Sequence, residues 1–251
     1  MKDTSWQKVA DWYADYSADA RSYHQTVIIP NLIRVLGPVR DCGVLDLACG
    51  AGVVSAALAQ AGALVTGVDA SSTLIAHAQK STVDISPQPK FYVTPADKLP
   101  LADRAVDSAV CVLAIQNIQS VKETFVECAR VLKPSGRLEL VLNHPAFRIP
   151  QGSAWGWDAT THKQYRRVDY YLSEKTVDIV AHPGQQKSKA TISFHRPLQY
   201  YVKLLTAAGF VVTRLEEWIS PKKSQHGPRQ KEEDRLRKEI PLFMLIEARL
   251  V

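Results

Sequence analysis

Two glycines and two acidic residues are spaced along the first half of the chain in a pattern that suits a nucleotide-like ligand. Gly50 and Gly52 stand where the apolar run "VLDLA" turns into a helical pattern. Glycine allows the backbone of such a turn to approach a ligand closely. Asp69 ends the next apolar run, "LVTGVD", where a carboxylate can accept two hydrogen bonds from a ribose. This combination is a stronger signal than a glycine pair alone.

The residues around this turn help to distinguish between two kinds of ligand. Asp46 lies inside the first apolar run, where its charge would repel a dinucleotide pyrophosphate and attract an α-amino group. Ser55 stands where a dinucleotide fingerprint has glycine or alanine. Asp97, in "PADKLPLAD", could accept a hydrogen bond from an adenine amino group. Purely structural roles remain for each residue: a strand-end acid for Asp46, a tight turn for the glycines and a loop cap for Asp97. Together they favour S-adenosylmethionine over a nicotinamide dinucleotide.

The elements that must position these residues alternate between short apolar runs and helical patterns. The runs "VLDLA", "LVTGVD", "KFYVT", "AVDSAVCVLAI" and "GRLELVLN" are expected strands, and Gly62 and "KPSG" are helix-stop signals. Such alternation predicts a parallel sheet with right-handed crossovers. Residues 1–40 predict two helices, whose Tyr13 and Tyr23 could form a lid or simply pack the helices together. Residues 144–195 predict an insertion of antiparallel strands, and "VVTRLEEW" and "LFMLIEARL" predict two final strands.

The composition places the chain among ordinary globular proteins. It has 251 residues, of which 46% are hydrophobic and 22% charged, enough for one α/β domain with an insertion. No signal peptide or membrane-spanning run is evident. The cysteines show no CxxC pairing, which indicates free thiols in a reducing cytoplasm. The net charge of +6 is scattered, so nucleic-acid binding is not expected. His182 and His195 lack a recognised metal spacing, and we assign no metal.

Four stretches resemble, in order and spacing, the motifs of class I S-adenosylmethionine-dependent methyltransferases. They are "LDLACGAG", "GVDAS", "ADKLPLADRAVDSAV" and "LKPSGRLEL". The resemblance covers about residues 40–143 and is closest to the small-molecule branch that includes ubiquinone and menaquinone biosynthesis methyltransferases. It implies one α/β domain over residues 1–251, with a Rossmann-like sheet of seven strands, mostly parallel, an antiparallel last strand and helices on both faces.

The resemblance implies S-adenosyl-L-methionine as the cofactor and gives the motif residues their roles. Asp46 would hold its amino group, directly or through water, and Asp69 would bind both ribose hydroxyls. Asp97 would contact the adenine amino group, and Leu113 would offer its carbonyl to the cofactor's amino group. The other residues would lie against the methionine and ribose part (Ala48, Gly50, Gly52), border the adenine (Ala70, Ser71, Leu74) or flank Asp97 (Ala96, Lys98). Ala48 replaces a glycine found in many relatives.

Residues for a methyl acceptor are expected beyond the carboxyl ends of the strands. His144 directly follows the fifth strand and could serve as a general base near neutral pH, or merely bond its own loop. Arg148 could bind an acidic or carbonyl group of the acceptor, or pair with an acid of the insertion, and Gln116 could orient the acceptor. The insertion supplies the aromatic residues of a cap, its own small core or a dimer surface: Trp155, Trp157, Tyr165, Tyr170, Tyr171, Phe194 and His195.

These inferences lead to one expected function and its alternatives. We expect transfer of a methyl group to an oxygen, nitrogen or carbon atom of a small molecule, planar or apolar as an aromatic cap would suit. The alternatives are an RNA methyltransferase and a non-catalytic S-adenosylmethionine-binding protein; a nicotinamide-dependent oxidoreductase is disfavoured by Asp46 and Ser55. The protein is expected to be cytoplasmic and a monomer or homodimer.

Overall fold

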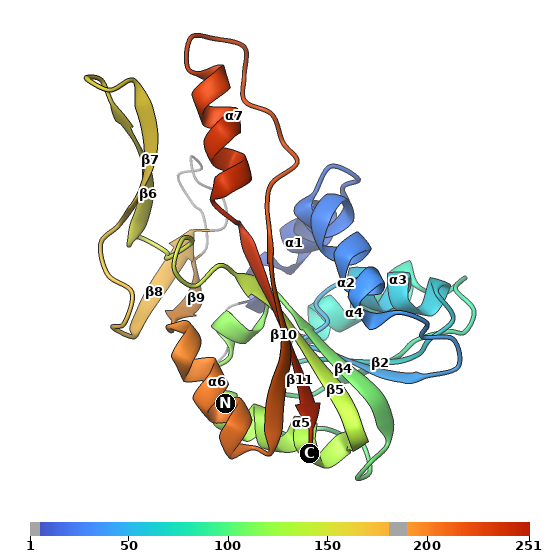
Figure 1. Cartoon of the computed structure of the whole chain (residues 1–251). Helices are drawn as coiled ribbons and strands as arrows, with labels where there is room; N and C mark the ends of the chain where they lie inside the picture. Colours follow the sequence, from blue (N-terminus) through green and yellow to red (C-terminus); the bar gives the residue numbers. More distant parts are fainter. Residues whose placement is uncertain (1–5, 181–189) are drawn as a thin grey trace.

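A mixed sheet of seven strands organises the computed structural model, which describes residues 6–180 and 190–251 (Figure 1). The strands lie in the order β10-β11-β5-β4-β1-β2-β3. Strands β1 to β5 are parallel to one another, whereas β11 runs antiparallel to both β5 and β10. The bounds are β1 Gly43–Leu47, β2 Leu64–Asp69, β3 Lys90–Val93, β4 Val106–Val112, β5 Leu132–Asn143, β10 Phe210–Trp218 and β11 Phe243–Leu250. The predicted fold class and the antiparallel last strand are confirmed.

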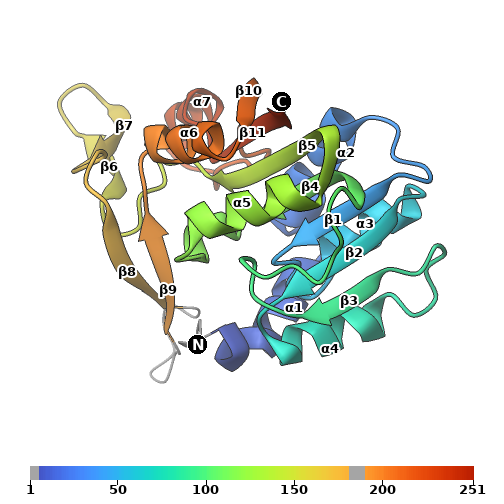
Figure 2. The same ribbon diagram turned by 90° about the horizontal axis from the view of Figure 1, so that it is seen from below.

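The central strands are apolar along nearly their whole length because helices cover both faces of the sheet. On one face, α2 (Ile29–Leu36) and α3 (Val53–Gln60) pack their buried Leu32 and Leu58 against β1, β4 and β11. On the other face, α5 (Val121–Val131) and α6 (Leu198–Ala207) contribute the fully buried Phe125 and Tyr201 (Figure 2). The three layers hold the carboxyl ends of β1, β2, β4 and β5 at one edge.

The N-terminal segment lies over that edge and is fastened to α4 (Ser72–Ser81). It consists of η1 (Trp6–Val9), α1 (Ala10–Ala18) and η2 (His24–Ile28), which leads into α2. Gln7 donates to the hydroxyls of Ser72 and Thr73, and His77 lies 2.7 Å from the Asp11 carboxylate. These contacts join the start of the chain to the strand–helix unit that follows β2. Residues 1–5 lie outside the described part of the chain.

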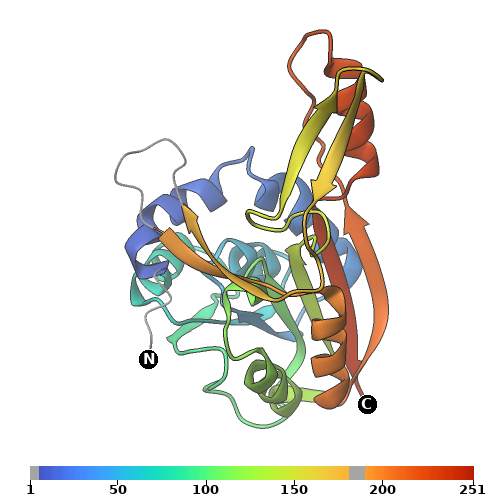
Figure 3. The ribbon, with the colours of Figure 1, turned by 90° about the vertical axis from the view of Figure 1, so that its left-hand side faces the viewer.

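The insertion after β5 forms two separate antiparallel hairpins, as the alternating pattern predicted. The first pairs β6 (Ser153–Asp158) with β7 (Lys163–Val168), and the second pairs β8 (Lys175–Val180) with β9 (Ala190–His195). The β6–β7 hairpin extends beside α7 (Gln230–Glu239), away from the main sheet (Figures 1 and 3). Residues 181–189, including His182, lie outside the described residues.

Within the described residues, no helix combines the length and the apolar character needed to cross a bilayer.

Candidate active site

A cavity of about 610 Å³ opens at the carboxyl edge of the sheet, where most of the predicted cofactor residues meet. Its floor is formed by the turn after β1, the end of β2 and the end of β4, and its walls by the loops that follow β3 and β4. The N-terminal segment and the β8–β9 hairpin complete it. The predicted residues that line it are Ala48, Gly50, Asp69, Ala70, Ser71, Leu74, Ala96, Asp97, Lys98 and Leu113.

Asp69 is held rigidly at the end of β2. Its Oδ2 accepts a hydrogen bond from the Gly50 backbone N–H (3.0 Å), and its Oδ1 accepts one from the Ser71 N–H (2.8 Å). Each carboxylate oxygen keeps further acceptor capacity. Burial raises the pKa of Asp69, while the backbone N–H groups oppose that shift. The arrangement suits a carboxylate that receives a second pair of hydrogen bonds from a diol in the cavity.

The two glycines of the turn lie against different parts of the chain. Gly50 has a φ of +55°, and a Cβ placed there would lie 2.9 Å from the ring of Tyr13. It therefore lies beneath the N-terminal segment and lines the cavity. Gly52 does not line the cavity: a Cβ there would lie 2.8 Å from Ala78 of α4, and its φ is +80°. Gly52 begins α3 and allows α4 to pack closely, and its contact with the methionine and ribose part of a cofactor stays a prediction.

Asp46 lies behind the cavity rather than on its wall. Its side chain is buried and accepts a hydrogen bond from the Ser55 hydroxyl at 2.6 Å. Burial raises the pKa of Asp46 to about 7; the Ser55 hydrogen bond opposes this shift, and the charge of Asp69 adds to it. Asp46 borders a space of about 10 Å³ together with Tyr13 and His24, which is the size of a single water. A cationic group in the main cavity could thus interact with Asp46 through one water.

Tyr13 lines both of these spaces. Of the two roles considered from sequence, a lid or a helix contact, its position supports the lid. Its hydroxyl lies 3.3 Å from the Nε2 of His24. Burial lowers the pKa of His24 to about 4, so this imidazole is neutral at physiological pH. Tyr23 lies elsewhere: its hydroxyl is 3.1 Å from the Ser220 hydroxyl and its ring packs on Phe243.

Ser71 and its neighbours join the N-terminal segment to the cavity. The Ser71 hydroxyl accepts from the Leu74 N–H at 3.2 Å, which caps α4, and donates to the Gln7 side chain at 2.7 Å. Gln7 and Trp6 also line the cavity. Neither was expected as a site residue, because a polar and an aromatic residue near a chain end carry no local signal of their partner.

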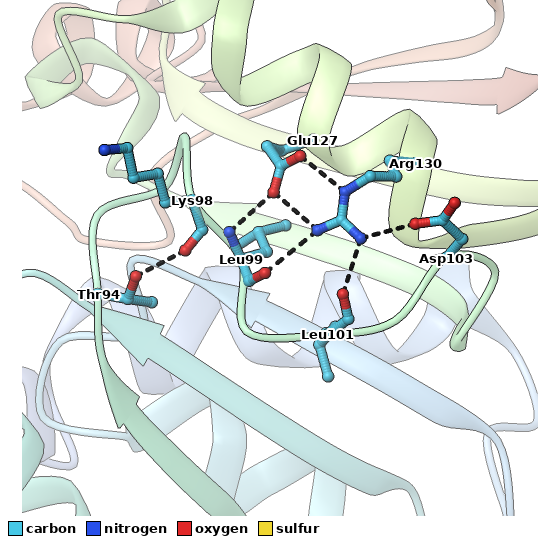
Figure 4. Close-up of polar contacts among 7 residues, drawn as sticks. All are labelled: Thr94, Lys98, Leu99, Leu101, Asp103, Glu127 and Arg130. Carbon is cyan, nitrogen blue, oxygen red and sulfur yellow. Dashed lines mark hydrogen bonds and ion pairs between the residues drawn. The ribbon is translucent and has the colours of Figure 1, made fainter.

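The loop that carries Asp97 is fastened to α5 by a charged network (Figure 4). Glu127 accepts from the Leu99 N–H at 2.8 Å and from Arg130 at 2.7 and 2.8 Å. Arg130 in turn donates to the carbonyls of Leu99 and Leu101 and to Asp103. The Ser120 hydroxyl donates to Asp97 Oδ2 at 2.8 Å. These contacts fix one Asp97 oxygen and leave the side chain on the cavity wall.

Leu113 and the loop after it form the opposite wall. Leu113 has a positive φ of 52°, unusual for a residue with a side chain. Its carbonyl accepts from the side-chain amides of Gln116 (3.0 Å) and Asn117 (3.3 Å), so an amino group of a ligand would have to compete for it. Asn117 lines the cavity whereas Gln116 does not, so the structure favours Asn117 over the predicted Gln116 as the residue facing a ligand.

His144 does not line the cavity, and both of its ring nitrogens are engaged. The Nδ1 accepts from the backbone N–H groups of Ala146 (3.2 Å) and Phe147 (3.3 Å). The Nε2 must then carry the proton, and it donates to Glu217 at 2.6 Å. The ring is buried, 4% exposed, and burial lowers its pKa against the opposing effect of Glu217. This geometry supports the second role considered from sequence, a histidine that bonds its own loop.

Only one of the two hairpins contributes to the cavity. Ile192 and Phe194 of β9 line it, and the intervening Ser193 points the other way and donates to the Gln116 carbonyl at 3.4 Å. Arg196, buried after β9, donates to the carbonyls of Ile115, Ile118 and Gln119 and so fastens the hairpin to the β4 loop. The other predicted cap aromatics do not line the cavity: Trp155, Trp157, Tyr165, Tyr170, Tyr171 and His195.

Comparisons with known proteins show what this chain is similar to in sequence and in fold. Residues 45–140 match the model of the family described as "Methyltransferase domain". The chain is 31% identical to the demethylmenaquinone methyltransferase of Renibacterium salmoninarum over 117 residues, which are 46% of this chain and 48% of that protein. It is 33% identical to the ubiquinone biosynthesis O-methyltransferase of Coxiella burnetii over 99 residues, which are 38% of this chain and 41% of that protein. The chain thus spans about half or less of the length of these curated relatives.

A solved structure extends the likeness in fold to most of the chain. An S-adenosylmethionine-dependent methyltransferase from Mesorhizobium loti aligns with 88% of this chain and 96% of its own, with a TM-score of 0.69 and 24% identity. Residues 45–140 thus match the methyltransferase family model, and the strand order and fold of the chain are those of class I S-adenosylmethionine-dependent methyltransferases. The similar structure from Mesorhizobium loti is named as S-adenosylmethionine-dependent, which indicates S-adenosylmethionine as the methyl donor.

The residues around the cavity fit this cofactor. The fixed carboxylate of Asp69 suits the two ribose hydroxyls, and the free lone pairs of Asp97 suit the adenine amino group. The side chains of Leu74, Ala96 and Leu113 provide apolar walls for a planar base. Asp46 supplies a negative charge behind the turn, on the side where the cationic methionine end would lie. The donors and acceptors thus match the chemical groups of the nucleoside and the amino acid parts.

Proposed function

We propose that the protein transfers a methyl group from S-adenosylmethionine to an oxygen, nitrogen or carbon atom of a small planar or aromatic molecule. The observation that carries this proposal is that the cavity continues from Asp69 to an apolar roof made by Trp6, Ile192 and Phe194. Its volume of about 610 Å³ falls within the usual range of small-molecule sites, about 300–1,000 Å³. The cavity therefore has the size and the apolar surface of a small-molecule site.

The chain would contribute positioning and the exclusion of water to this reaction. When bound, the cofactor supplies an electrophilic methyl group on a sulfonium. Asp69 and the glycine turn fix the ribose, and the buried Asp46 favours the cationic end. Tyr13 and Phe194 would cover the space above and exclude water. Alignment of the acceptor atom in line with the methyl group provides most of the acceleration in such a displacement.

Two measurements test the proposed function. Calorimetric titration should show binding of S-adenosylhomocysteine and none of a nicotinamide dinucleotide. Transfer of a labelled methyl group should then be measured to a panel of hydroxylated and amino-substituted aromatic compounds, and to total RNA in parallel. Transfer to RNA alone would indicate the alternative RNA methyltransferase. Binding without transfer to any acceptor would support a non-catalytic protein, and binding of the dinucleotide alone would contradict the proposal.

The affinity for S-adenosylhomocysteine should depend on pH through Asp46. Because its pKa is raised to about 7 by burial, Asp46 is protonated below that pH in the free protein. The cationic amino group of the ligand requires the ionised form, so binding should weaken as the pH falls below 7, by up to about 10-fold per pH unit. Titration calorimetry between pH 5.5 and 8.5 would measure this change, and two buffers of different ionisation enthalpy would reveal the released proton.

The Ser55→Ala variant sharpens this prediction. Ser55 donates a hydrogen bond to Asp46 and holds its pKa down, so its removal should move the pH profile to higher pH. Ser81→Ala is a matched control, because Ser81 donates to the backbone carbonyls of Ala51 and Ala78 and contacts no acid. An affinity that stays constant from pH 6 to 8 in the wild type would show that Asp46 does not sense the bound ligand.

His144→Ala should affect stability more than chemistry. The substitution leaves two backbone N–H groups without their acceptor and removes a buried ring, which should cost about 1–3 kcal/mol in free energy of unfolding. The single-turnover rate of methyl transfer should fall by less than about 10-fold at all pH values, since the imidazole does not face the cavity. A loss of about 10²–10⁴-fold, together with the disappearance of an imidazole ionisation, would restore the general-base role.

A further inference from the structure

Three arginines from separate parts of the chain gather beyond the end of β5. Arg148 follows β5, Arg166 belongs to β7 and Arg237 to α7. We call them the arginine cluster. The Nε of Arg166 donates to the Phe147 carbonyl at 2.7 Å, so its guanidinium lies against the loop that carries Arg148. Arg148 and Arg166 repel one another, as do Arg148 and Arg237.

In the part of the chain that the structure describes, the arginine cluster has too few carboxylates nearby to neutralise its positive charge. Within the described residues, no hydrogen bond or ion pair holds the Arg148 guanidinium, and the neighbouring cations Arg166 and Arg237 repel it. Burial lowers the pKa of Arg148, and it lowers the pKa of Arg166 to about 10. Asp234, one turn earlier on α7, interacts with Arg237 and with Lys223. The three arginines are partly buried, and cations that are partly removed from water are stabilised by pairing, so an anion would stabilise this arrangement.

The groups that surround the arginine cluster are suited to an oxyanion. Arg166 Nη2 donates to the Ser153 hydroxyl (2.7 Å) and Arg237 Nε to the Ser224 hydroxyl (3.0 Å), so both guanidinium groups are oriented and retain further donors. The Lys222 ammonium lies 4.5 Å from the centre of the Tyr23 ring and adds positive charge nearby. Guanidinium groups present planar forks of donors that match carboxylate and phosphate oxygens.

The arginine cluster does not line the cavity but lies at the same edge of the sheet. Arg148 follows the carboxyl end of β5, and β4, beside it, ends at the cavity wall. Tyr23 belongs to the N-terminal segment, whose Tyr13 lines the cavity. We propose that Arg148, Arg166 and Arg237 bind the carboxylate or phosphate group of the methyl acceptor. The assignment of this oxyanion to the acceptor rests on the proposed function, whereas the oxyanion site itself does not.

Titration of the full chain with inorganic pyrophosphate tests the oxyanion site. The measurement is made in the presence of S-adenosylhomocysteine and at constant ionic strength. The wild type should bind pyrophosphate, and Arg148→Gln should weaken that binding by at least about 10-fold. Arg235→Gln is the matched control: Arg235 lies on the same helix as Arg237 but is paired with Glu232, so its removal should leave pyrophosphate binding unchanged. Absence of pyrophosphate binding by the wild type, or equal loss in both variants, would overturn the site.

Thermal unfolding separates this role from a purely structural one. In chloride buffer, Arg148→Gln should unfold at the same temperature as the wild type or higher, because a repelled cation has been removed. Pyrophosphate should raise the unfolding temperature of the wild type and not that of the variant. If Arg148→Gln instead unfolds at a lower temperature and still binds pyrophosphate, Arg148 is structural and the proposal fails.

Two further probes identify the source of the oxyanion. Phenyl phosphate should bind at least about 10-fold more tightly than inorganic phosphate, because an aromatic ring would add contacts in the cavity. Equal affinities would overturn the assignment to the acceptor and indicate a site for a free anion. Much tighter binding of a short RNA oligonucleotide through the same arginines would overturn it in favour of nucleic acid. Failure of S-adenosylhomocysteine to bind would contradict the proposed function and leave the pyrophosphate result standing.

Discussion

Asp69→Ala should weaken the binding of S-adenosylhomocysteine by about 2–4 kcal/mol, which corresponds to a loss of roughly 30- to 1,000-fold in affinity. The carboxylate is fixed by the N–H groups of Gly50 and Ser71 and faces the cavity, so two charge-assisted hydrogen bonds to the ribose would be lost at once. The pre-formed geometry adds to the effect, because the wild-type side chain needs no reorganisation to bind. Titration calorimetry would measure the change.

The same contacts mean that Asp69 also holds the glycine turn, and the experiment must separate the two effects. Asp69→Asn retains an oxygen for one of the two backbone N–H groups and should lose affinity with less damage to the turn. Asp107→Ala is the control, since Asp107 likewise accepts from a backbone N–H, that of Gly43 (2.8 Å), but does not line the cavity. If the affinity of a folded Asp69→Ala protein equals that of the wild type, the ribose is held by other residues.

The local sequence was sufficient to predict the sheet and the floor of the cavity. Strands buried on both faces are nearly continuous apolar runs, and the residues that follow them occupy one edge whatever the rest of the chain does. Asp69 and Leu113 end or follow such strands, Asp97 follows the exposed edge strand β3, and all three line the cavity. Their positions depend on elements only a few residues away, which is why a pattern of types and spacing could locate them.

Contacts between distant segments could not be predicted in the same way. The partner of His144 is Glu217, 73 residues further along the chain, and nothing near His144 indicates it. Gly52 matches a ligand-binding turn in sequence, yet its missing side chain makes room for Ala78. The three carbonyls that Arg196 binds precede it by 77 to 81 residues. These roles follow from tertiary packing, and propensity and spacing contain no information about it.

In the insertion, too, the local sequence does not predict the tertiary contacts. Both hairpins contain alternating apolar and polar residues, so the pattern gives each of them a face that could cover a ligand. The structure turns β6 and β7 toward α7, where Arg229 lies over the Trp157 ring at 4.7 Å. It turns β9 toward the cavity through the bonds of Ser193 and Arg196 to the β4 loop. These hydrogen bonds determine which of the two hairpins covers the cavity.

Phe194→Ala should lower kcat/KM for the acceptor by about 10- to 100-fold. Phe194 lines the cavity, and burial of an aromatic side chain against a ligand contributes about 1.5–3 kcal/mol, most of which the alanine variant would forfeit. The affinity for S-adenosylhomocysteine should change by less than about 3-fold, because the bonds to Asp69 and Asp97 remain. Initial rates at saturating cofactor and direct titration of S-adenosylhomocysteine would give the two numbers separately.

Two further variants test whether the effect is specific to the Phe194 side chain as part of the cavity roof. Phe194→Leu keeps an apolar side chain of similar reach and should recover part of the lost turnover. Trp157→Ala removes an aromatic ring of the β6–β7 hairpin, which does not line the cavity. This variant should keep kcat/KM for the acceptor and the affinity for S-adenosylhomocysteine near their wild-type values. Equal losses of acceptor turnover and cofactor affinity in Phe194→Ala would mean that β9 covers the cofactor instead. The acceptor would then have to lie nearer Tyr13 and the N-terminal segment, the remaining cover of the cavity.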